Sequence, residues 1–251
     1  MSNGTALVTG AGRRIGRQIA LDLAVDGYAV AVHCNRSVEE GQAVVDEIRA
    51  KGGRAVVVVG DLAKLETLDR LIAEAAALGL LTVLINSASL FENDLIGKMT
   101  AHSFQSHMDV NLRAPLFLSQ AFAAQLPAGT HGNIINIIDQ RVWRLNPSFF
   151  SYTISKSALW TATKTMAQSL APRIRVNAIG PGPTLPSLRQ TEEEFAKQES
   201  LTPLGRGTSP MEISQAIKFI LSAPAMTGQM IALDGGQHLA WGTRDVIDVT
   251  E

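Results

Sequence analysis

A tyrosine and a lysine four residues apart have the clearest potential for chemistry in this chain. Tyr152 and Lys156 stand in Y-T-I-S-K, within an Ala/Ser/Thr-rich segment that predicts a helix, and this spacing places both side chains on one helical face. A free tyrosine has a pKa of about 10, and a neighbouring cation lowers that pKa by favouring the phenolate. A tyrosine tuned in this way can exchange a proton near neutral pH. The alternative is an ordinary solvated helix face.

Asp139 is a third candidate for proton chemistry. It follows the apolar run N-I-I-N-I-I, which predicts a buried strand. A carboxylate near Tyr152 would raise the tyrosine pKa and oppose Lys156, so we expect the groups to titrate as a coupled unit. If burial also raises the pKa of Asp139, the carboxyl group could donate a proton during reduction of a C=N bond. The alternative is that Asp139 only caps the loop that follows it.

The elements that must position these residues follow from alternating apolar runs and helix-period segments. Strands are predicted at residues 5–9, 28–33, 54–59, 82–86, 134–138, 174–178 and 230–233. Helices are predicted at residues 14–26, 38–50, 65–78, about 101–125, 151–170 and 210–221. The early strands are continuously apolar, which is typical of a parallel sheet covered on both faces. The regular alternation predicts an α/β fold with a doubly wound parallel sheet of the Rossmann type.

The composition restricts the classes of protein to which the chain can belong. Its 251 residues are 46% hydrophobic and 18% charged, so we expect one domain over residues 1–251. A net charge of −1 and a pI of about 6.5 favour neither a nucleic-acid partner nor a membrane partner. The single Cys34 fits a reducing compartment. With no signal-peptide pattern and no apolar run of about 18 residues, we expect a cytoplasmic protein.

A glycine-rich turn follows the first predicted strand and opens the first helix. In T-G-A-G-R-R-I-G, residues 9–16, Gly10 and Gly12 let the backbone turn tightly and approach a ligand. The N–H groups of the helix would then face a pyrophosphate. The spacing differs from the G-x-G-x-x-G fingerprint. Its position in the first β-α-β unit favours a nucleotide site over a structural turn.

The end of the second strand favours NADP(H) over NAD(H). An NAD site needs a carboxylate there for the ribose hydroxyls, but the strand ends in H-C-N-R-S, residues 33–37. Arg36 can pair with a 2′-phosphate, Ser37 opens a helix whose N-terminus favours an anion, and Arg13 or Arg14 can assist. The alternative is a surface arginine beside an N-cap serine.

Two further strand ends could contact the nucleotide. In G-D-L, residues 60–62, Asp61 and the backbone could bind the adenine edge. In N-S-A-S, residues 86–89, the side chains are small enough to let the backbone approach a cofactor. Either segment could equally be an ordinary β-α turn.

Over essentially its whole length the chain resembles the short-chain dehydrogenase/reductases. The motifs are T-G-x-x-x-x-I-G, Asp61, residues 86–88, D-V-N-L, Y-x-x-x-K, R-V-N-A-I-G-P-G and L-D-G-G, in the family's order. The resemblance implies catalytic roles for Asn111, as part of a proton relay, and for Tyr152 and Lys156. The cofactor site predicted from all these motifs comprises Gly10, Arg13, Arg14, Ile15, Gly16, His33, Asn35, Arg36, Ser37, Asp61, Leu62, Asn86, Ser87, Ala88, Tyr152, Lys156, Pro181 and Gly182.

Two departures are similar to the pteridine reductase branch, which includes dihydromonapterin reductase-like enzymes. Arg14 stands where the family usually has Gly, and Asp139 where it usually has a catalytic Ser. The motifs R-R-I-G, H-x-N-R-S and N-S-A-S-L-F resemble the same branch. The resemblance implies that Phe91 stacks a pterin against the nicotinamide. It also implies that Arg14 and Ser89 touch pterin and cofactor phosphates, and that Asp139 works with Tyr152 in proton delivery.

The hydrogen-bonding properties of a carboxylate also favour a pterin substrate. A serine at position 139 would donate a hydrogen bond to a carbonyl oxygen, whereas an ionised Asp139 only accepts. An aminopyrimidine ring offers N–H donors, so it suits a carboxylate better than a simple ketone does.

The rest of the chain gives weaker predictions. The segment 181–207 mixes Pro and Gly with a short acidic helix, and such connections are often lids. The tail at residues 238–245 is less polar than a free end requires, and we expect it to pack in a homotetramer, as the family resemblance implies. His102 and His107 are five apart and share no helical face, so no metal is predicted.

We therefore expect an NADPH-dependent reductase that transfers hydride to a dihydropteridine. The alternative role for Phe91 is a core or lid contact, and the alternative for Asn111 is a polar residue that kinks the helix. One alternative function is a carbonyl reductase for an acyl, sugar or other small ketone that tolerates Asp139. A second is a non-catalytic NADP(H)-binding sensor, against which Tyr152, Lys156 and Asn111 argue.

Overall fold

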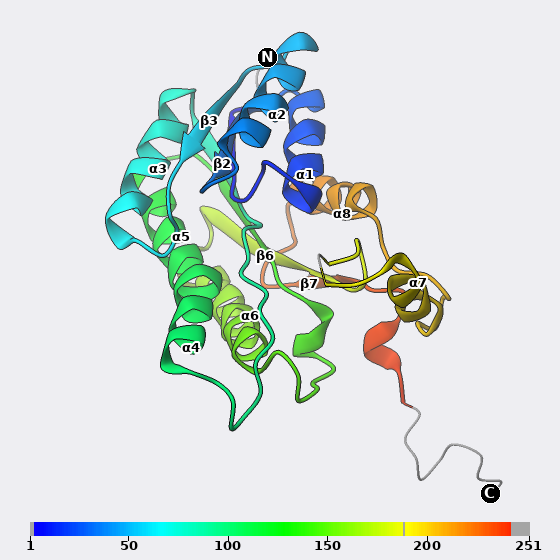
Figure 1. Ribbon diagram of the computed structural model, residues 1–251. Helices are drawn as coiled ribbons and strands as arrows, with labels where there is room; N and C mark the ends of the chain where they lie inside the picture. Colours follow the sequence, from blue (N-terminus) through cyan, green and yellow to red (C-terminus); the bar gives the residue numbers. More distant parts are fainter. Residues whose placement is uncertain (1–2, 188, 242–251) are drawn as a thin grey trace, which may run out of the picture.

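The computed structural model describes residues 3–187 and 189–241, and a seven-stranded sheet forms its centre (Figure 1). The strands are β1 (Thr5–Val8), β2 (Ala29–Cys34), β3 (Ala55–Val59), β4 (Leu81–Asn86), β5 (Gly132–Ile137), β6 (Ile174–Pro181) and β7 (Met230–Leu233). Their order is β3-β2-β1-β4-β5-β6-β7, and every neighbouring pair is parallel. The order reverses direction beside β1, so the predicted doubly wound α/β fold is confirmed.

Helices cover both faces of this sheet (Figure 1). They are α1 (Arg14–Val25), α2 (Val38–Ala50), α3 (Leu65–Ala77), α4 (Ala101–Met108), α5 (Ala114–Gln125), α6 (Phe150–Leu170), α7 (Glu192–Ser200) and α8 (Pro210–Ser222). One apolar core joins the sheet to α1, α2 and α8, through residues such as Ile19, Val44 and Ile217. A second core joins the opposite face to α3, α5 and α6. None of these helices is long and apolar enough to cross a membrane, in the part of the chain that the structure describes.

The helix predicted at about residues 101–125 is interrupted by a π-helical turn, Asp109–Arg113. Pro115 explains the break, because it lacks the N–H that would bond to the carbonyl of Asn111 in a regular α-helix. π-turns inside helices occur frequently at functional sites. The interruption places Asn111 in the π-turn between α4 and α5, where it is fully buried.

The carboxyl ends of the parallel strands meet at one edge of the sheet. The turns after β1, β2, β3, β4 and β5 therefore gather there, and each carries one of the predicted site motifs. β6 continues to Pro181, three residues past its predicted end, and leads into the segment 181–207. Its helix α7 buries none of its residues and lies beyond the strand ends, away from the sheet (Figure 1). This edge is where open α/β sheets bind ligands.

Candidate active site

The buried Tyr152 and the half-buried Asp139 form a hydrogen-bonded pair. The hydroxyl of Tyr152 donates to Oδ2 of Asp139 at 2.9 Å, and Tyr152 is 5% exposed. Asp139 follows β5 and is the N-cap of a short 3-10 turn, where its Oδ1 accepts from the N–H of Arg141 at 2.8 Å. One carboxylate oxygen of Asp139 therefore caps the turn, and the other accepts the hydrogen bond of the tyrosine.

Lys156 lies one helical turn after Tyr152 on α6 and is 2% exposed. Its ammonium group donates to the carbonyl of Ile137 at 2.7 Å and lies 5.8 Å from the centre of the Tyr152 ring. Burial lowers the pKa of Lys156 to about 8, although the nearby Asp139 opposes the change. The predicted helical face is therefore buried at the strand ends, and the interpretation as a solvated face is wrong.

The pKa of Tyr152 differs from the first expectation. Burial, followed by the charge of Asp139, raises it well above its usual value, while Arg141 and a hydrogen bond with Ser89 act in the lowering direction. The expected lowering by Lys156 is wrong for this arrangement, whereas the expected opposition by Asp139 is confirmed. Burial also raises the pKa of Asp139. Both shifts favour the protonated form, so the pair is suited to hold a proton that it can donate.

The side chain of Asn111 orders the turn after β4. Its Oδ1 accepts from the N–H of Leu90 at 2.7 Å, and its Nδ2 donates to the carbonyl of Leu90 at 2.9 Å and to Ser155 Oγ at 3.1 Å. The hydroxyl of Ser89 donates to the same Oδ1 at 3.3 Å. These bonds fix residues 89–91 against α6, and none of them joins Asn111 to Tyr152.

Phe91 contacts the tyrosine, as the predicted site requires. Its ring meets the ring of Tyr152 edge-on, with centroids 4.7 Å apart and an interplanar angle of 75°. It is 36% exposed. A residue that was not predicted, Phe149, stacks on Phe91. The only signal for it in the sequence is the pair of phenylalanines just before Ser151.

The turn after β1 accepts no side chain at two positions. A Cβ on Gly10, whose φ is +66°, would lie 2.9 Å from Cα of Ala88, and a Cβ on Gly16 would lie 2.4 Å from the carbonyl oxygen of Gly10. Thr9 Oγ accepts from the N–H groups of Ser87 and Ala88, at 3.0 Å each. The ends of β1 and β4 are therefore in direct backbone contact, which leaves a smooth surface for a ligand.

Two of the helices that begin at this edge, α1 and α2, have N-cap residues that make no side-chain capping hydrogen bond. Neither Arg13 before α1 nor Ser37 before α2 makes a capping hydrogen bond, and α1 has no acidic residue in its first turn. Free N–H groups at a helix N-terminus suit the phosphates of a dinucleotide. Arg13 forms an ion pair with Glu40 of α2, which leaves the exposed Arg36 as the better candidate for a 2′-phosphate.

Arg14 adopts the backbone conformation that glycine favours. Its φ is +53°, which explains why a Gly would be comfortable at this position. Its guanidinium group donates to the carbonyls of Leu185 and Pro186, at 3.1 and 2.8 Å. Arg14 thus links the nucleotide turn to the segment 181–207.

His33 holds the glycine-rich turn after β1 in place by a hydrogen bond. It is 2% exposed; its Nδ1 accepts from the N–H of Gly10 at 3.2 Å, and its Nε2 donates to the carbonyl of Gly60 at 3.0 Å. Burial lowers the pKa of His33 to about 4, so the ring is neutral at pH 7. Its predicted contact with the cofactor is therefore indirect, through the backbone of Gly10.

Several other predicted residues can reach a cofactor only in part. The side chains of Ile15 and Leu62 pack in the two cores, so they offer backbone alone. One carboxylate oxygen of Asp61 accepts from the N–H of Ala63 at 3.0 Å. Asn35 is exposed beside Arg36.

Two strand ends beside the tyrosine are also held tightly. Asn86 donates to Asn136 at 2.8 Å, and Asn136 donates to Thr163 on α6 at 2.8 Å; neither of these partners was predicted. Pro181 ends β6, and the N–H of Gly182 bonds to the carbonyl of Leu233 at 2.9 Å.

Two predicted features fall partly outside the described residues. Of the tail at residues 238–245, residues 242–245 lie outside, and so does Leu188 of the segment 181–207. Within residues 3–187 and 189–241, no group of three or more His, Cys, Asp or Glu side chains could hold a metal ion.

Comparison with known proteins places this geometry in a family. Residues 4–197 match the family model of the short chain dehydrogenases. The chain is 50% identical to the FolM alternative dihydrofolate reductase 1 of Brucella suis, solved in complex with NADP, with a TM-score of 0.95 over 97% of this chain and 98% of that one. It is 30% identical to a short chain dehydrogenase of Burkholderia cenocepacia solved with NADP, with a TM-score of 0.88 over 94% and 98% of the two chains.

A curated relative has a different printed activity. The chain is 34% identical to a 3-oxoacyl-(acyl-carrier-protein) reductase of Staphylococcus epidermidis, over 94% of this chain and 100% of the relative. The predicted enzyme class and cofactor are confirmed at the level of the family, since the matched family is one of dehydrogenases and the two similar structures named above were solved with NADP. The chain belongs to the short-chain dehydrogenase family of oxidoreductases.

Proposed function

We propose that this protein is an NADPH-dependent reductase of dihydropteridine-type substrates, of the pteridine reductase kind. The observation that carries the proposal is the hydrogen bond between the buried Tyr152 and the half-buried Asp139, at a position where the family resemblance implies serine. Reduction of a C=N bond needs a proton at nitrogen, and this pair holds its protons because burial raises the pKa of both groups. Tyr152 delivers the proton, and Asp139 replenishes it.

The carboxyl group of Asp139 can also recognise the substrate. Each of its oxygens makes one hydrogen bond, to Arg141 and to Tyr152, and each carboxylate oxygen has a further lone pair. The N–H donors of an aminopyrimidine ring match these acceptors. Phe91, which is edge-on to Tyr152, would stack the ring of the substrate.

The carboxyl edge of the sheet would hold the cofactor. The uncapped N-terminus of α1 and the backbone of Gly10 would bind the pyrophosphate, and Arg36 with Ser37 would bind the 2′-phosphate. NADPH, when bound, supplies the hydride. Lys156 would hold the nicotinamide ribose. Its pKa of about 8 keeps the ammonium group charged at neutral pH, and this charge also favours the deprotonated tyrosine left after proton transfer.

The comparisons support this proposal at different levels. The Brucella suis protein, half of whose residues are identical over nearly the full length, is described as an alternative dihydrofolate reductase, and dihydrofolate contains a dihydropteridine ring. We further propose that residues 1–251 form one cytoplasmic domain that assembles as a homotetramer, and a monomer in light scattering would contradict that assembly.

A second candidate function is reduction of a carbonyl group. The 34% identity to 3-oxoacyl-(acyl-carrier-protein) reductase favours it. Asp139 favours the pteridine proposal instead, because it stands where the family resemblance implies a catalytic serine. A non-catalytic NADP(H)-binding sensor is a weaker candidate, because such a protein has no use for Tyr152, Lys156 and Asp139 together.

One assay separates these candidates. NADPH oxidation is followed with dihydrobiopterin, dihydromonapterin, dihydrofolate and a panel of ketones including a 3-oxoacyl thioester. The pteridine proposal requires turnover of at least one dihydropteridine. Turnover of ketones alone would favour the carbonyl reductase, and tight NADPH binding without any turnover would favour the sensor.

Asp139→Ser is the matching variant. Because it removes the proton donor of the pair, we expect kcat with a dihydropteridine to fall about 10²- to 10⁴-fold. Asp46→Ser, on the exposed face of α2, is the control and should keep full activity. An Asp139→Ser enzyme as active as the wild type would contradict the role given to Asp139.

A further inference from the structure

The ring of Phe91 packs against a second aromatic ring. The ring of Phe149 is stacked on it, with centroids 4.2 Å apart and an interplanar angle of 2°. Parallel aromatic pairs at this distance stabilise each other beyond the area that they bury. One face of Phe91 is therefore covered, and only the opposite face remains for a planar ligand.

The backbone of Phe149 is held in an unfavourable conformation. Its φ of +57° lies in the left-handed region, where a bulky residue is strained. Asn93 Oδ1 accepts from the N–H of Phe149 at 3.1 Å, and the carbonyl of Asp94 accepts from the N–H of Phe150 at 3.1 Å. Strain that is kept in place by neighbouring groups in this way concentrates at functional sites.

Phe149 is also linked to the proton-donating pair. The guanidinium carbon of Arg141 lies over its ring, 5.2 Å from the centroid, and the N–H of Arg141 donates to Oδ1 of Asp139 at 2.8 Å. Tyr152 completes this set of contacts, because it donates a hydrogen bond to Asp139 and its ring contacts that of Phe91 edge-on. The contacts thus form a closed ring of five residues.

We propose that Phe149 is a positioning residue, which fixes the plane of Phe91 relative to Tyr152 and Asp139 so that a flat conjugated substrate stacks in reach of the proton donor. This inference rests on the function proposed above. In this role Phe149 acts on the substrate only through the ring of Phe91. The stack restricts the tilt of Phe91, and the cost of ordering that ring is met during folding instead of during substrate binding.

The inference predicts a specific kinetic effect. Without the second ring, Phe91 can tilt away from a parallel arrangement with the substrate. Because an aromatic pair of this kind is worth a modest free energy, we expect the KM for a dihydropteridine to rise about three- to tenfold. The dissociation constant of NADPH should not change, since Phe149 takes no part in the nucleotide edge.

Two substitutions at this position test the inference. Phe149→Asn removes the ring and introduces a residue that tolerates the left-handed conformation, so the backbone is not disturbed, whereas Phe149→Tyr keeps the ring. The inference requires that Phe149→Asn raises KM more than it lowers kcat, and that Phe149→Tyr restores the wild-type KM. Phe219→Asn, on an exposed position of α8, is the matched control and should keep the wild-type KM.

The outcomes separate the inference from the proposed function. A wild-type protein that turns over no dihydropteridine would overturn the proposed function, and the inference with it. A wild-type protein that does so, with the same KM in Phe149→Asn, would overturn the inference alone. An equal loss of NADPH affinity and melting temperature in Phe149→Asn and Phe149→Tyr would show a purely structural role and would also overturn it.

Discussion

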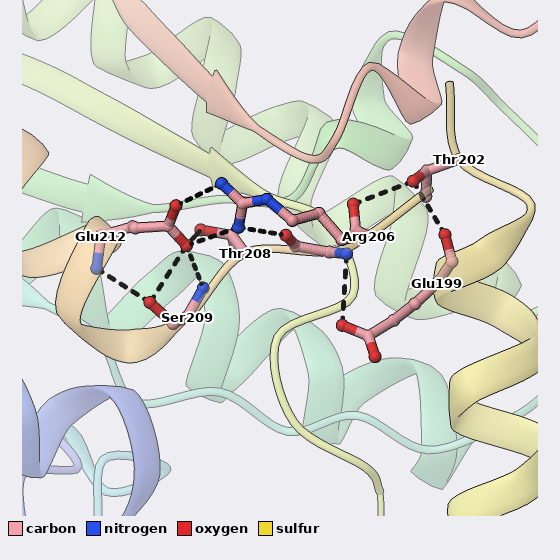
Figure 2. A network of polar contacts seen from close by, with 7 residues as sticks. Glu199, Thr202, Arg206, Thr208, Ser209 and Glu212 are labelled. Atoms are coloured by element: carbon pink, nitrogen blue, oxygen red, sulfur yellow. Dashed lines mark hydrogen bonds and ion pairs between the residues drawn. The ribbon is translucent and has the colours of Figure 1, made fainter. Parts of the chain in front are cut away.

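The N-terminus of α8 is capped by side chains, whereas the N-termini of α1 and α2 are not. At the start of α8, Ser209 and Glu212 form a capping box, and Glu212 also pairs with Arg206 (Figure 2). In the same network, Glu199 accepts from the N–H of Gly207, and the hydroxyl of Thr202 donates to the carbonyl of Arg206. At the starts of α1 and α2, by contrast, no side chain caps the helix.

The pKa shifts of the ionisable groups also differ between the start of α8 and the carboxyl edge of the sheet. At the α8 junction the hydrogen bond between Arg206 and Glu212 lowers the pKa of Glu212 to about 2 and raises the pKa of Arg206, so both charged forms are favoured. At the sheet edge burial lowers the pKa of Lys156 and raises that of Asp139, so both pKa values shift in the direction of the neutral form.

This difference shows how function can be distinguished from stability. A region whose donors and acceptors satisfy one another, as at α8, has nothing left to offer a ligand. A region with uncapped helix N-termini and buried groups whose pKa is shifted toward the neutral form retains both binding capacity and proton chemistry. Changes in the first region should affect stability alone, and changes in the second should affect ligand binding or catalysis.

The largest effect is expected at His33, where a substitution should change both folding stability and NADPH binding. Because its pKa falls from 6.5 to about 4 on folding, unfolded chains bind a proton in this range while folded chains do not. The stability contributed by neutral His33 is complete above pH 6.5 and is lost as the pH falls toward 4. The shift corresponds to about 3 kcal/mol.

Denaturant unfolding at pH 7, 5.5 and 4.5 measures this loss. In His33→Gln the acid-induced decrease over the same range should shrink by most of that amount, while NADPH binding at pH 7 should weaken because Gly10 loses its support. His131→Gln, at an exposed histidine, is the control. If acid lowered the free energy of unfolding of His33→Gln as much as that of the wild type, the role given to His33 would be contradicted.

A smaller effect is expected for Arg36, which belongs to the cofactor edge alone. Arg36→Gln removes a charged hydrogen-bond donor from the proposed 2′-phosphate site, and such bonds are worth about 1.5 to 3 kcal/mol. The dissociation constant of NADPH should therefore rise about 10- to 100-fold, while that of NADH should stay nearly constant. Fluorescence titration with both cofactors measures this, and Arg70→Gln on α3 is the control. Equal weakening for both cofactors would remove the assigned role.

The smallest effect compares two serines at equivalent helix positions. Ser209→Ala breaks the capping box of α8 and should cost about 1 kcal/mol of stability, or about 2 to 4 °C in melting temperature, with unchanged kinetics. Ser37→Ala, at the uncapped start of α2, should change stability by less than about 0.5 kcal/mol and weaken NADPH binding. Calorimetry and cofactor titration of both variants check the pair, and a reversed result would refute the distinction between the two regions.

The sequence alone was sufficient for the sheet and for the motifs that gather at its carboxyl edge. Periodicity predicts strands and helices because the side-chain spacing of each element is local. The carboxyl ends of parallel strands must meet at one edge, so motifs such as those at Thr9, Arg36 and Asp139 could be brought together before any coordinates were known. The family resemblance implied that Asp139 works with Tyr152, and the structure joins the two residues by a hydrogen bond.

Other features depended on contacts that no local pattern contains. The π-turn at Asn111 was missed, although Pro115 in the sequence could have indicated it. The partners of Arg13 and Arg14 lie on α2 and on the segment 181–207, and the stacking of Phe149 on Phe91 joins residues 58 positions apart. Such pairs form only when distant loops converge.

What the sequence determined by itself was therefore which groups meet at the edge of the sheet. Only the tertiary structure decided their protonation, because burial is a property of the whole fold. The helical spacing of Tyr152 and Lys156 suggested a lowered tyrosine pKa, yet complete enclosure beside Asp139 raises that pKa instead. Removal of water from around these groups outweighs the attraction of one cation, and the proton donation that we propose for the pair depends on this.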